Sequence, residues 1–225
     1  MCGRFTLTVD LKTLESYLEN SFKIKTMPKN LNIPRYNIAP SQQVLAIIND
    51  GKENRLGYLN WGFLPPWEKT KKTQIINARS ETIDHKKSFK DSFSRKRCII
   101  LSDGFFEWHQ SNKTPYYFTL KNRNIMALAG IYSTNILEDG SWYHHTAIVT
   151  TEANTMLSNI HTRMPVILDK ESIYDYLNPK INDPIKLKKL LTPYDASLMT
   201  HKQVSKTVND VRNDSPNCIK PIQKK

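Results

Sequence analysis

The sequence predicts a single α+β domain built around a curved antiparallel sheet or an open barrel with flanking helices. Segments rich in β-branched and aromatic residues recur along the chain and are separated by turn-forming residues. Helical segments are scattered among them without the regular strand and helix alternation of parallel sheets. The chain has 225 residues, enough for one such domain. We expect it to span residues 1–215, followed by a basic, flexible tail at 216–225.

Short patterns predict the amino-terminal elements. CGRFTLTV alternates loosely as a short strand, and Asp10 is a suitable N-cap for the helix that follows. Four apolar residues of that helix fall at helical spacing and are expected in the core: Leu11, Leu14, Tyr17 and Leu18. Three prolines then predict a loop from 27 to 41.

The remaining elements are expected in alternating blocks. Residues rich in β-formers predict strands at 43–49, 55–62, 97–101, 104–109, 116–121, 125–132 and 142–150. Helices are expected within 86–95, 152–159, 170–177 and 184–191. An extended backbone at 76–81 would place Asn77, Arg79 and Glu81 on one face, because strand side chains alternate.

Composition narrows the function classes. Lys and Arg number 33 and Asp and Glu 21, a formal charge of +12 that favours a polyanionic partner, nucleic acid first. A basic protein with a solvated surface and no such partner has the same charge. Neither a secretion signal nor an apolar run of membrane-spanning length is found in the sequence. We expect a soluble, cytoplasmic, monomeric protein without a membrane partner.

The cysteines favour a reducing compartment. Cys2, Cys98 and Cys218 are too few and too scattered for a disulfide framework or a zinc-binding pair. The histidines show no metal-ligand spacing, so we expect neither metal nor cofactor.

Cys2 is the first candidate for chemistry. Removal of Met1 would leave an α-amine and a thiol on one residue, and such a 1,2-aminothiol can condense with an aldehyde to give a thiazolidine. Both groups titrate near neutrality, with ordinary pKa values of about 8 and about 8.5. Gly3 would allow close backbone approach to a ligand, and Arg4 adds a fixed cation. The alternative is that Cys2 is a small buried hydrophobic residue.

Three further segments place polar residues among apolar ones. They are INARSE at 76–81, DGFFEW at 103–108 and IHTRMP at 160–165. Glu107 lies between large aromatics, where burial would raise its pKa toward general acid–base use. Each segment also has a structural interpretation: Asn77 as a turn cap, His161 as a core histidine, Glu107 paired with a lysine, and Arg79 and Arg163 paired with Glu81 or Asp169.

Taken together, the motifs closely resemble those of the SOS response-associated peptidase family, the abasic-site-processing proteins with an SRAP domain. The matching segments are MCGRF, RYNIAPSQ, WGFLPPW, INARSET, RCIILSDGFFEW, TPYYF, LAGIY, TTEAN and IHTRMPVIL. The resemblance implies one α+β domain with a basic groove for single-stranded DNA. It also implies a DNA damage response enzyme that shields abasic sites by a thiazolidine crosslink through Cys2.

The resemblance also assigns roles. It implies that Cys2 is the nucleophile, Asn77 orients its amine, Glu107 is the acid–base and His161 assists sugar ring opening and crosslink turnover. It implies DNA contacts by Gly3, Arg4, Asn37, Pro40, Trp67, Arg79, Thr150 and Arg163. The arginines among them would hold phosphates.

Three alternatives remain at this stage. An N-terminal-nucleophile amidohydrolase, such as a glutamine amidotransferase, would use Cys2 with its own amine as base. A peptidase would be limited to autocatalytic removal of Met1. A non-enzymatic single-strand binder would use only its aromatic and basic residues.

Overall fold

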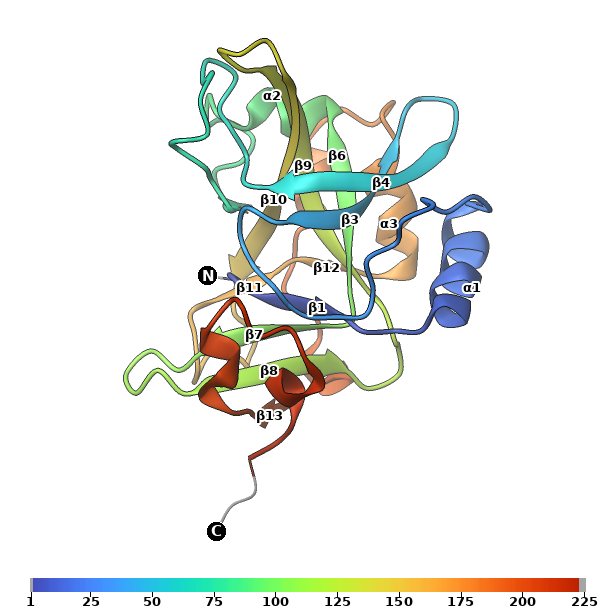
Figure 1. Cartoon of the computed structure of the whole chain (residues 1–225). Helices are drawn as coiled ribbons and strands as arrows, with labels where there is room; N and C mark the ends of the chain where they lie inside the picture. Colours follow the sequence, from blue (N-terminus) through green and yellow to red (C-terminus); the bar gives the residue numbers. More distant parts are fainter. Residues whose placement is uncertain (1, 223–225) are drawn as a thin grey trace.

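The computed structural model describes residues 2–222 and has the expected α+β architecture (Figure 1). In this range the strands form two sheets, and the larger one lies above the smaller in the view of Figure 1. The chain begins at one side of the molecule, between the two sheets.

The larger sheet closes on itself as a barrel. Its strands pair in the cyclic order β4, β3, β6, β9, β10, and the ring closes because β10 pairs with both β9 and β4. The strands of this ring are β3 (Gln43–Asn49), β4 (Asn54–Trp61), β6 (Arg97–Ser102), β9 (Met126–Ile136) and β10 (Trp142–Glu152). Three short strands extend it: β5 (Asn77–Arg79), β11 (Arg163–Pro165) and β12 (Ile167–Leu168).

The smaller sheet carries the start of the chain. Its strands are antiparallel in the order β13, β8, β7, β1, β2. Their bounds are β1 (Phe5–Leu7), β2 (Arg35–Ile38), β7 (Gly104–Trp108), β8 (Pro115–Leu120) and β13 (Met199–Gln203). Strand β1 lies beside β7, so residues near the amino terminus lie next to the DGFFEW segment.

Helices cover the outside of this framework. Their bounds are α1 (Leu11–Phe22), α2 (Lys90–Arg95), α3 (Lys170–Leu177) and α4 (Pro184–Lys189), with 3₁₀ turns η1 (Ala196–Leu198), η2 (Lys206–Asn209) and η3 (Pro216–Ile219). The predicted cap of α1 is confirmed, since the Asp10 side chain accepts from the Thr13 amide at 2.8 Å. Within residues 2–222, no helix is both long and apolar enough to cross a membrane.

Several local predictions differ from the structure. Leu11 is 52% exposed rather than in the core, because it begins α1 on the solvent side. Residues 152–159 do not form a helix: β10 runs to Glu152, and the Asn154 side chain accepts from the amides of Met156 and Leu157, which holds a turn instead. The proline-rich loop contains strand β2, and β5 ends at Arg79, so Glu81 lies in the following turn.

The carboxy-terminal segment also differs from the expectation of a flexible tail from residue 216. The side chain of Cys218 is fully buried against Phe106, Tyr117 and Val208, and Pro221 bridges to Val204. Residues 223–225 lie outside the described part of the chain. Residues 216–222 therefore pack against the smaller sheet and the segment that follows it.

Candidate active site

Cys2 is held against the strand that carries Glu107. The amide of Phe106 donates to the carbonyl of Arg4 at 2.9 Å, and Phe5 pairs with Phe105. The Cys2 side chain is fully buried. Burial raises the pKa of the Cys2 thiol well above its ordinary value, and the nearby Glu107 carboxylate raises it further. The thiol is therefore protonated in the chain that still carries Met1.

Asn77 connects the barrel to Cys2. Strand β5 pairs with β10, and the carbonyl of Ile76 accepts from the Trp61 indole at 2.9 Å, which fixes the backbone beside Asn77. The Asn77 Nδ2 donates to the carbonyl oxygen of Cys2 at 2.9 Å. Its Oδ1 is buried, and within residues 2–222 no donor reaches it. The side chain thus presents an acceptor beside the backbone of Cys2.

Glu107 is a buried carboxyl group. It is 2% exposed on β7, opposite Tyr116 of β8. Burial raises the pKa of Glu107 to about 7, as its aromatic sequence setting predicted. At neutral pH both its acidic and its basic form are populated, which suits a group that gives and takes protons.

His161 lies in the turn before β11. Its Nδ1 accepts from the Arg163 amide at 3.0 Å, so the proton of the neutral ring is assigned to Nε2. The Gln110 amide, just beyond β7, donates to the Ile160 carbonyl at 3.1 Å, which ties this turn to the end of the strand that bears Glu107. Burial lowers the pKa of His161, so its ring is neutral at physiological pH.

The three arginines expected to hold phosphates differ in their surroundings. Arg79 is exposed, and no carboxylate within residues 2–222 pairs with it. Arg163 forms an ion pair with Glu81, one of the partners the sequence suggested, and also donates to the Thr150 carbonyl at 2.7 Å. Arg4 donates to Asn37 Oδ1 at 2.8 Å and lies over the Trp108 ring.

Other residues expected to contact DNA fall into two groups. Trp67 is 63% exposed, and Gly3 and Pro40 are half-buried, so all three are accessible. Asn37 and Thr150 are fully buried. Their side chains contact Arg4 and Arg163, so any contribution of these two positions to DNA binding would pass through the arginines, and their direct DNA contact stays a prediction.

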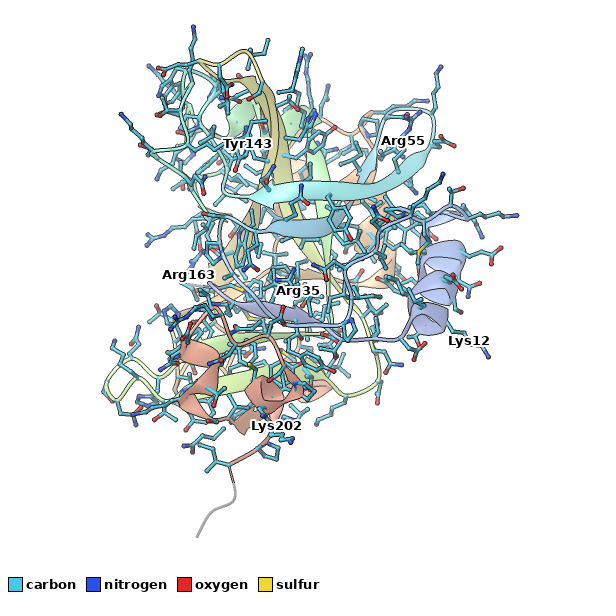
Figure 2. All side chains as sticks on the ribbon, in the orientation of Figure 1. Lys12, Arg35, Arg55, Tyr143, Arg163 and Lys202 are labelled. Atoms are coloured by element: carbon cyan, nitrogen blue, oxygen red, sulfur yellow. The ribbon has the colours of Figure 1, made fainter. Side chains whose placement is uncertain are left out.

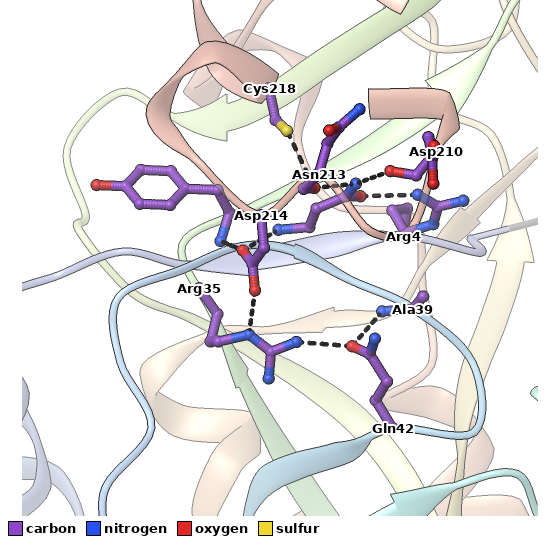
Figure 3. Close-up of polar contacts among 10 residues, drawn as sticks. Arg4, Arg35, Ala39, Gln42, Asp210, Asn213, Asp214 and Cys218 are labelled. Atoms are coloured by element: carbon purple, nitrogen blue, oxygen red, sulfur yellow. Dashed lines mark hydrogen bonds and ion pairs between the residues drawn. The ribbon is translucent and has the colours of Figure 1, made fainter. Parts of the chain in front are cut away.

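The carboxy-terminal segment is the part of the site that sequence reasoning missed. The Trp108 indole donates to Asn209 Oδ1 at 2.8 Å, and the Asn37 amide donates to the carbonyls of Val208, Asp210 and Asn213. Figure 3 shows Asp210 and Asn213 of this segment close to Arg4. The Asn and Asp residues at 209–214 were the available signal, since such residues cap tight turns.

Charge is spread over the molecule. Figure 2 shows Lys12 on α1, Arg55 on β4 and Lys202 on β13 at widely separated places, whereas Arg163 lies on the side where the chain begins. Local arginines, rather than the net charge of +12, therefore distinguish the site. Within the described residues, no three His, Cys, Asp or Glu side chains converge as a metal site.

Comparison with known proteins supports a common origin. The family described as SOS response associated peptidase (SRAP) matches residues 1–211. "Abasic site processing protein YoqW" of Bacillus subtilis is 44% identical over 97% of this chain and 99% of its own length. "Abasic site processing protein YedK" of Escherichia coli is 29% identical over 99% of this chain and 100% of its own length. A crystal structure of a Bacteroides thetaiotaomicron protein superposes with a TM-score of 0.83 at 25% identity, covering 99% of this chain and 100% of that one.

Proposed function

Because the chain belongs to the SOS response-associated peptidase family, we propose that it processes abasic sites in single-stranded DNA by forming a covalent crosslink through Cys2. The names of its relatives support abasic sites as the target. A DNA substrate implies action in the cytoplasm, at the nucleoid. The observation that carries the proposal is the Asn77 side chain, which binds the Cys2 carbonyl and leaves a buried Oδ1 acceptor beside it.

The proposed reaction begins once Met1 has been removed. The Cys2 α-amine adds to the C1′ aldehyde of the ring-opened abasic deoxyribose, and loss of water gives an imine. The Cys2 sulfur then adds to the imine carbon, and the thiol proton passes to the nitrogen. The product is a thiazolidine, and the net change is the release of one water molecule. No oxidant, reductant or metal is required.

The site residues supply positioning and proton transfer. Asn77 Oδ1 accepts a hydrogen bond from the α-amine and directs its lone pair toward the aldehyde. Protonated Glu107 delivers a proton to the departing hydroxyl and, once ionised, can accept the thiol proton. His161 assists opening of the sugar ring and later turnover of the crosslink. Buried Glu107 lies on β7, which pairs with β1 just after Cys2, and its carboxylate raises the pKa of the Cys2 thiol.

DNA binding is assigned to the accessible residues. Arg79 contacts a phosphate, and Arg163 does so when it exchanges Glu81 for the DNA. Trp67 provides an exposed ring for stacking beside the abasic position. Self-catalysed removal of Met1, a peptidase-like step, would use the same Cys2 and Glu107.

Mass spectrometry with single-stranded DNA bearing one abasic site tests the proposal. The parent protein should form a heat-stable adduct on Cys2, whereas Cys2→Ser should form only an imine that borohydride can trap. An equally stable adduct with Cys2→Ser would rule out the thiazolidine. Binding without any adduct would favour a non-enzymatic single-strand binder, and release of ammonia from glutamine would favour an amidotransferase.

A further inference from the structure

The segment 205–219, here called the carboxy-terminal clamp, lies directly behind the strand that carries Glu107. Side chains alternate along β7, so Phe106 and Trp108 face away from Phe105 and Glu107. Phe106 packs with Val208 and Cys218 of the clamp, whereas Phe105 belongs to the main core. The clamp therefore covers the face of β7 that is opposite to the reacting groups.

Arg4 joins the clamp to the start of the chain. Its Nη1 donates to the Val208 carbonyl at 2.7 Å and to Asn37 Oδ1 at 2.8 Å. Its guanidinium lies 5.7 Å from the centre of the Trp108 ring. Arg4 is two residues from Cys2, and Trp108 is next to Glu107, so the contact between Arg4 and Trp108 links the segments that carry the two reacting residues.

The clamp is itself anchored to β2. The side chain of Asp214 accepts a hydrogen bond from the backbone amide of Asn37 at 3.1 Å and forms an ion pair with Arg35. Arg35 in turn donates to Gln42 at 2.7 Å (Figure 3). The side-chain Nδ2 of Asn37 donates to three backbone carbonyls of the clamp, at 2.7–3.2 Å. These contacts fix the clamp relative to the sheet that holds Cys2.

We propose that the carboxy-terminal clamp positions Cys2 against Glu107, with Arg4 and Asn209 as positioning residues, and that Arg4 acts inward rather than as a phosphate ligand. The inference deepens the proposed function and rests on it. Condensation requires the amine, the aldehyde and the acid within reach of one another, and small displacements of such groups slow the reaction. The clamp contacts Phe106 and Trp108, on either side of Glu107, and Arg4, two residues after Cys2.

Asn209 offers a clean test because its exposed side chain makes one hydrogen bond within residues 2–222, to the Trp108 indole. We expect Asn209→Ala to slow crosslinking at saturating DNA by about 2–10-fold, the rate equivalent of up to one hydrogen bond. Affinity for DNA should be unchanged. The separate variant Asn209→Asp keeps an acceptor for the Trp108 indole and should crosslink at the parental rate. Asn217→Ala is the matched control, since Asn217 is exposed on the same segment and no hydrogen bond of its side chain is found within residues 2–222.

The reaction of Cys2 with a small aldehyde tests the role of the clamp without any contribution from DNA binding. Glycolaldehyde should form a thiazolidine with mature Cys2, and Asn209→Ala should slow that reaction by the same factor as crosslinking to DNA. If the parent reacts with glycolaldehyde but not with abasic DNA, the proposed DNA function fails, and the variants still test the clamp. Parental rates for Asn209→Ala with both aldehydes, or equal slowing by Asn217→Ala, would overturn the inference.

The salt dependence of binding tests the role of Arg4. Each phosphate contact on a single strand contributes about −0.7 to the slope of log affinity against log salt. We expect Arg79→Gln to reduce the magnitude of this slope by about that amount, and Arg4→Gln to leave the slope unchanged while slowing crosslinking. An equal reduction of slope in the two variants would show that Arg4 binds phosphate and would contradict the inference.

Discussion

Arg163 and Glu81 form a bidentate ion pair at the edge of the site. Arg163 Nη1 and Nη2 lie 2.5 Å and 3.0 Å from the two carboxylate oxygens of Glu81. A phosphate presents a similar pair of oxygens to a guanidinium, so in the DNA-bound state that we propose a phosphate would compete with Glu81 for Arg163. The Glu81 side chain is 48% exposed and the Arg163 side chain 14%. The Glu81 carboxylate can therefore swing into solvent while the Arg163 guanidinium stays in place.

Replacing Glu81 should therefore strengthen DNA binding. We expect Glu81→Gln to tighten affinity for single-stranded DNA by about 2–5-fold, because an exposed ion pair contributes about 0–1 kcal/mol. Glu138→Gln removes the same charge from an exposed position on the β9–β10 turn and should have a smaller effect. Fluorescence anisotropy at two salt concentrations measures both. Equal gains in the two variants would mean that net charge alone is responsible.

The buried Glu107 should make stability depend on pH. Burial raises its pKa from 4.5 to about 7. The folded state therefore binds this proton more tightly than the unfolded state, so the contribution of Glu107 to stability is fully present below pH 4.5 and is lost as the pH rises through 7. The shift corresponds to about 3 kcal/mol.

Glu107→Gln removes this dependence. The quantity to compare is the free energy of unfolding of the variant minus that of the parent. This difference should be more positive at pH 8 than at pH 4, by about 2–4 kcal/mol. Urea denaturation at both values measures the difference. The variant should also crosslink more slowly without weaker DNA binding. A pH-independent difference between parent and variant would contradict the raised pKa.

The exposed ring of Trp67 should contribute to DNA affinity. We expect Trp67→Ala to weaken binding to single-stranded DNA by about 1–3 kcal/mol, the range for one base stacked on an aromatic ring. Trp142 is the control, since it is 68% exposed, about as much as Trp67 at 63%, but lies at the end of the β9–β10 hairpin. Trp142→Ala should bind like the parent. Equal losses would place DNA on the hairpin as well.

The outcomes for Glu107 and Asn37 show what sequence can and cannot predict. Glu107 was correctly expected to be buried because its own neighbours are large aromatics, which is local information. Asn37 was expected to line the DNA groove, yet its amide is used by carbonyls more than 170 residues away. Periodicity and turn signals carry no information about such distant partners. For the same reason residues 216–219, the end of the clamp, were expected to belong to a tail, whereas helix α3 was expected within 170–177, where it lies.

Arg97 should be a determinant of stability rather than of activity. It is 4% exposed, and its guanidinium donates to five backbone carbonyls, those of Phe93, Ser94, Tyr176, Asn178 and Ile181. Lysine has three donors and no planar fork, so Arg97→Lys would leave carbonyls unpaired. We expect a loss of about 2–4 kcal/mol in the free energy of unfolding.

A matched control exists two residues earlier, at the last residue of α2. Arg95 is exposed, so Arg95→Lys should leave stability within about 0.5 kcal/mol of the parent. Thermal denaturation compares the two variants. Crosslinking per folded molecule should be parental in both, and a rate defect in Arg97→Lys below its melting transition would assign Arg97 a role in the site.

Asn77 separates two functions within one side chain. Its Nδ2 holds the Cys2 carbonyl at 2.9 Å, and its buried Oδ1 is the acceptor proposed for the α-amine. Asn77→Asp keeps an acceptor but loses the donor and places a carboxylate beside the carbonyl of Cys2. We expect it to slow crosslinking and to raise the pH at which the amine becomes reactive, because a nearby anion stabilises the protonated amine. Asn77→Ala removes both contacts and should slow the reaction at every pH without shifting the profile. Single-turnover rates from pH 5 to about 9, a range that brackets the ordinary α-amine pKa, measure both effects. If the two variants gave the same profile, the Oδ1 of Asn77 would have no role in directing the amine, and its contribution would reduce to holding the Cys2 backbone.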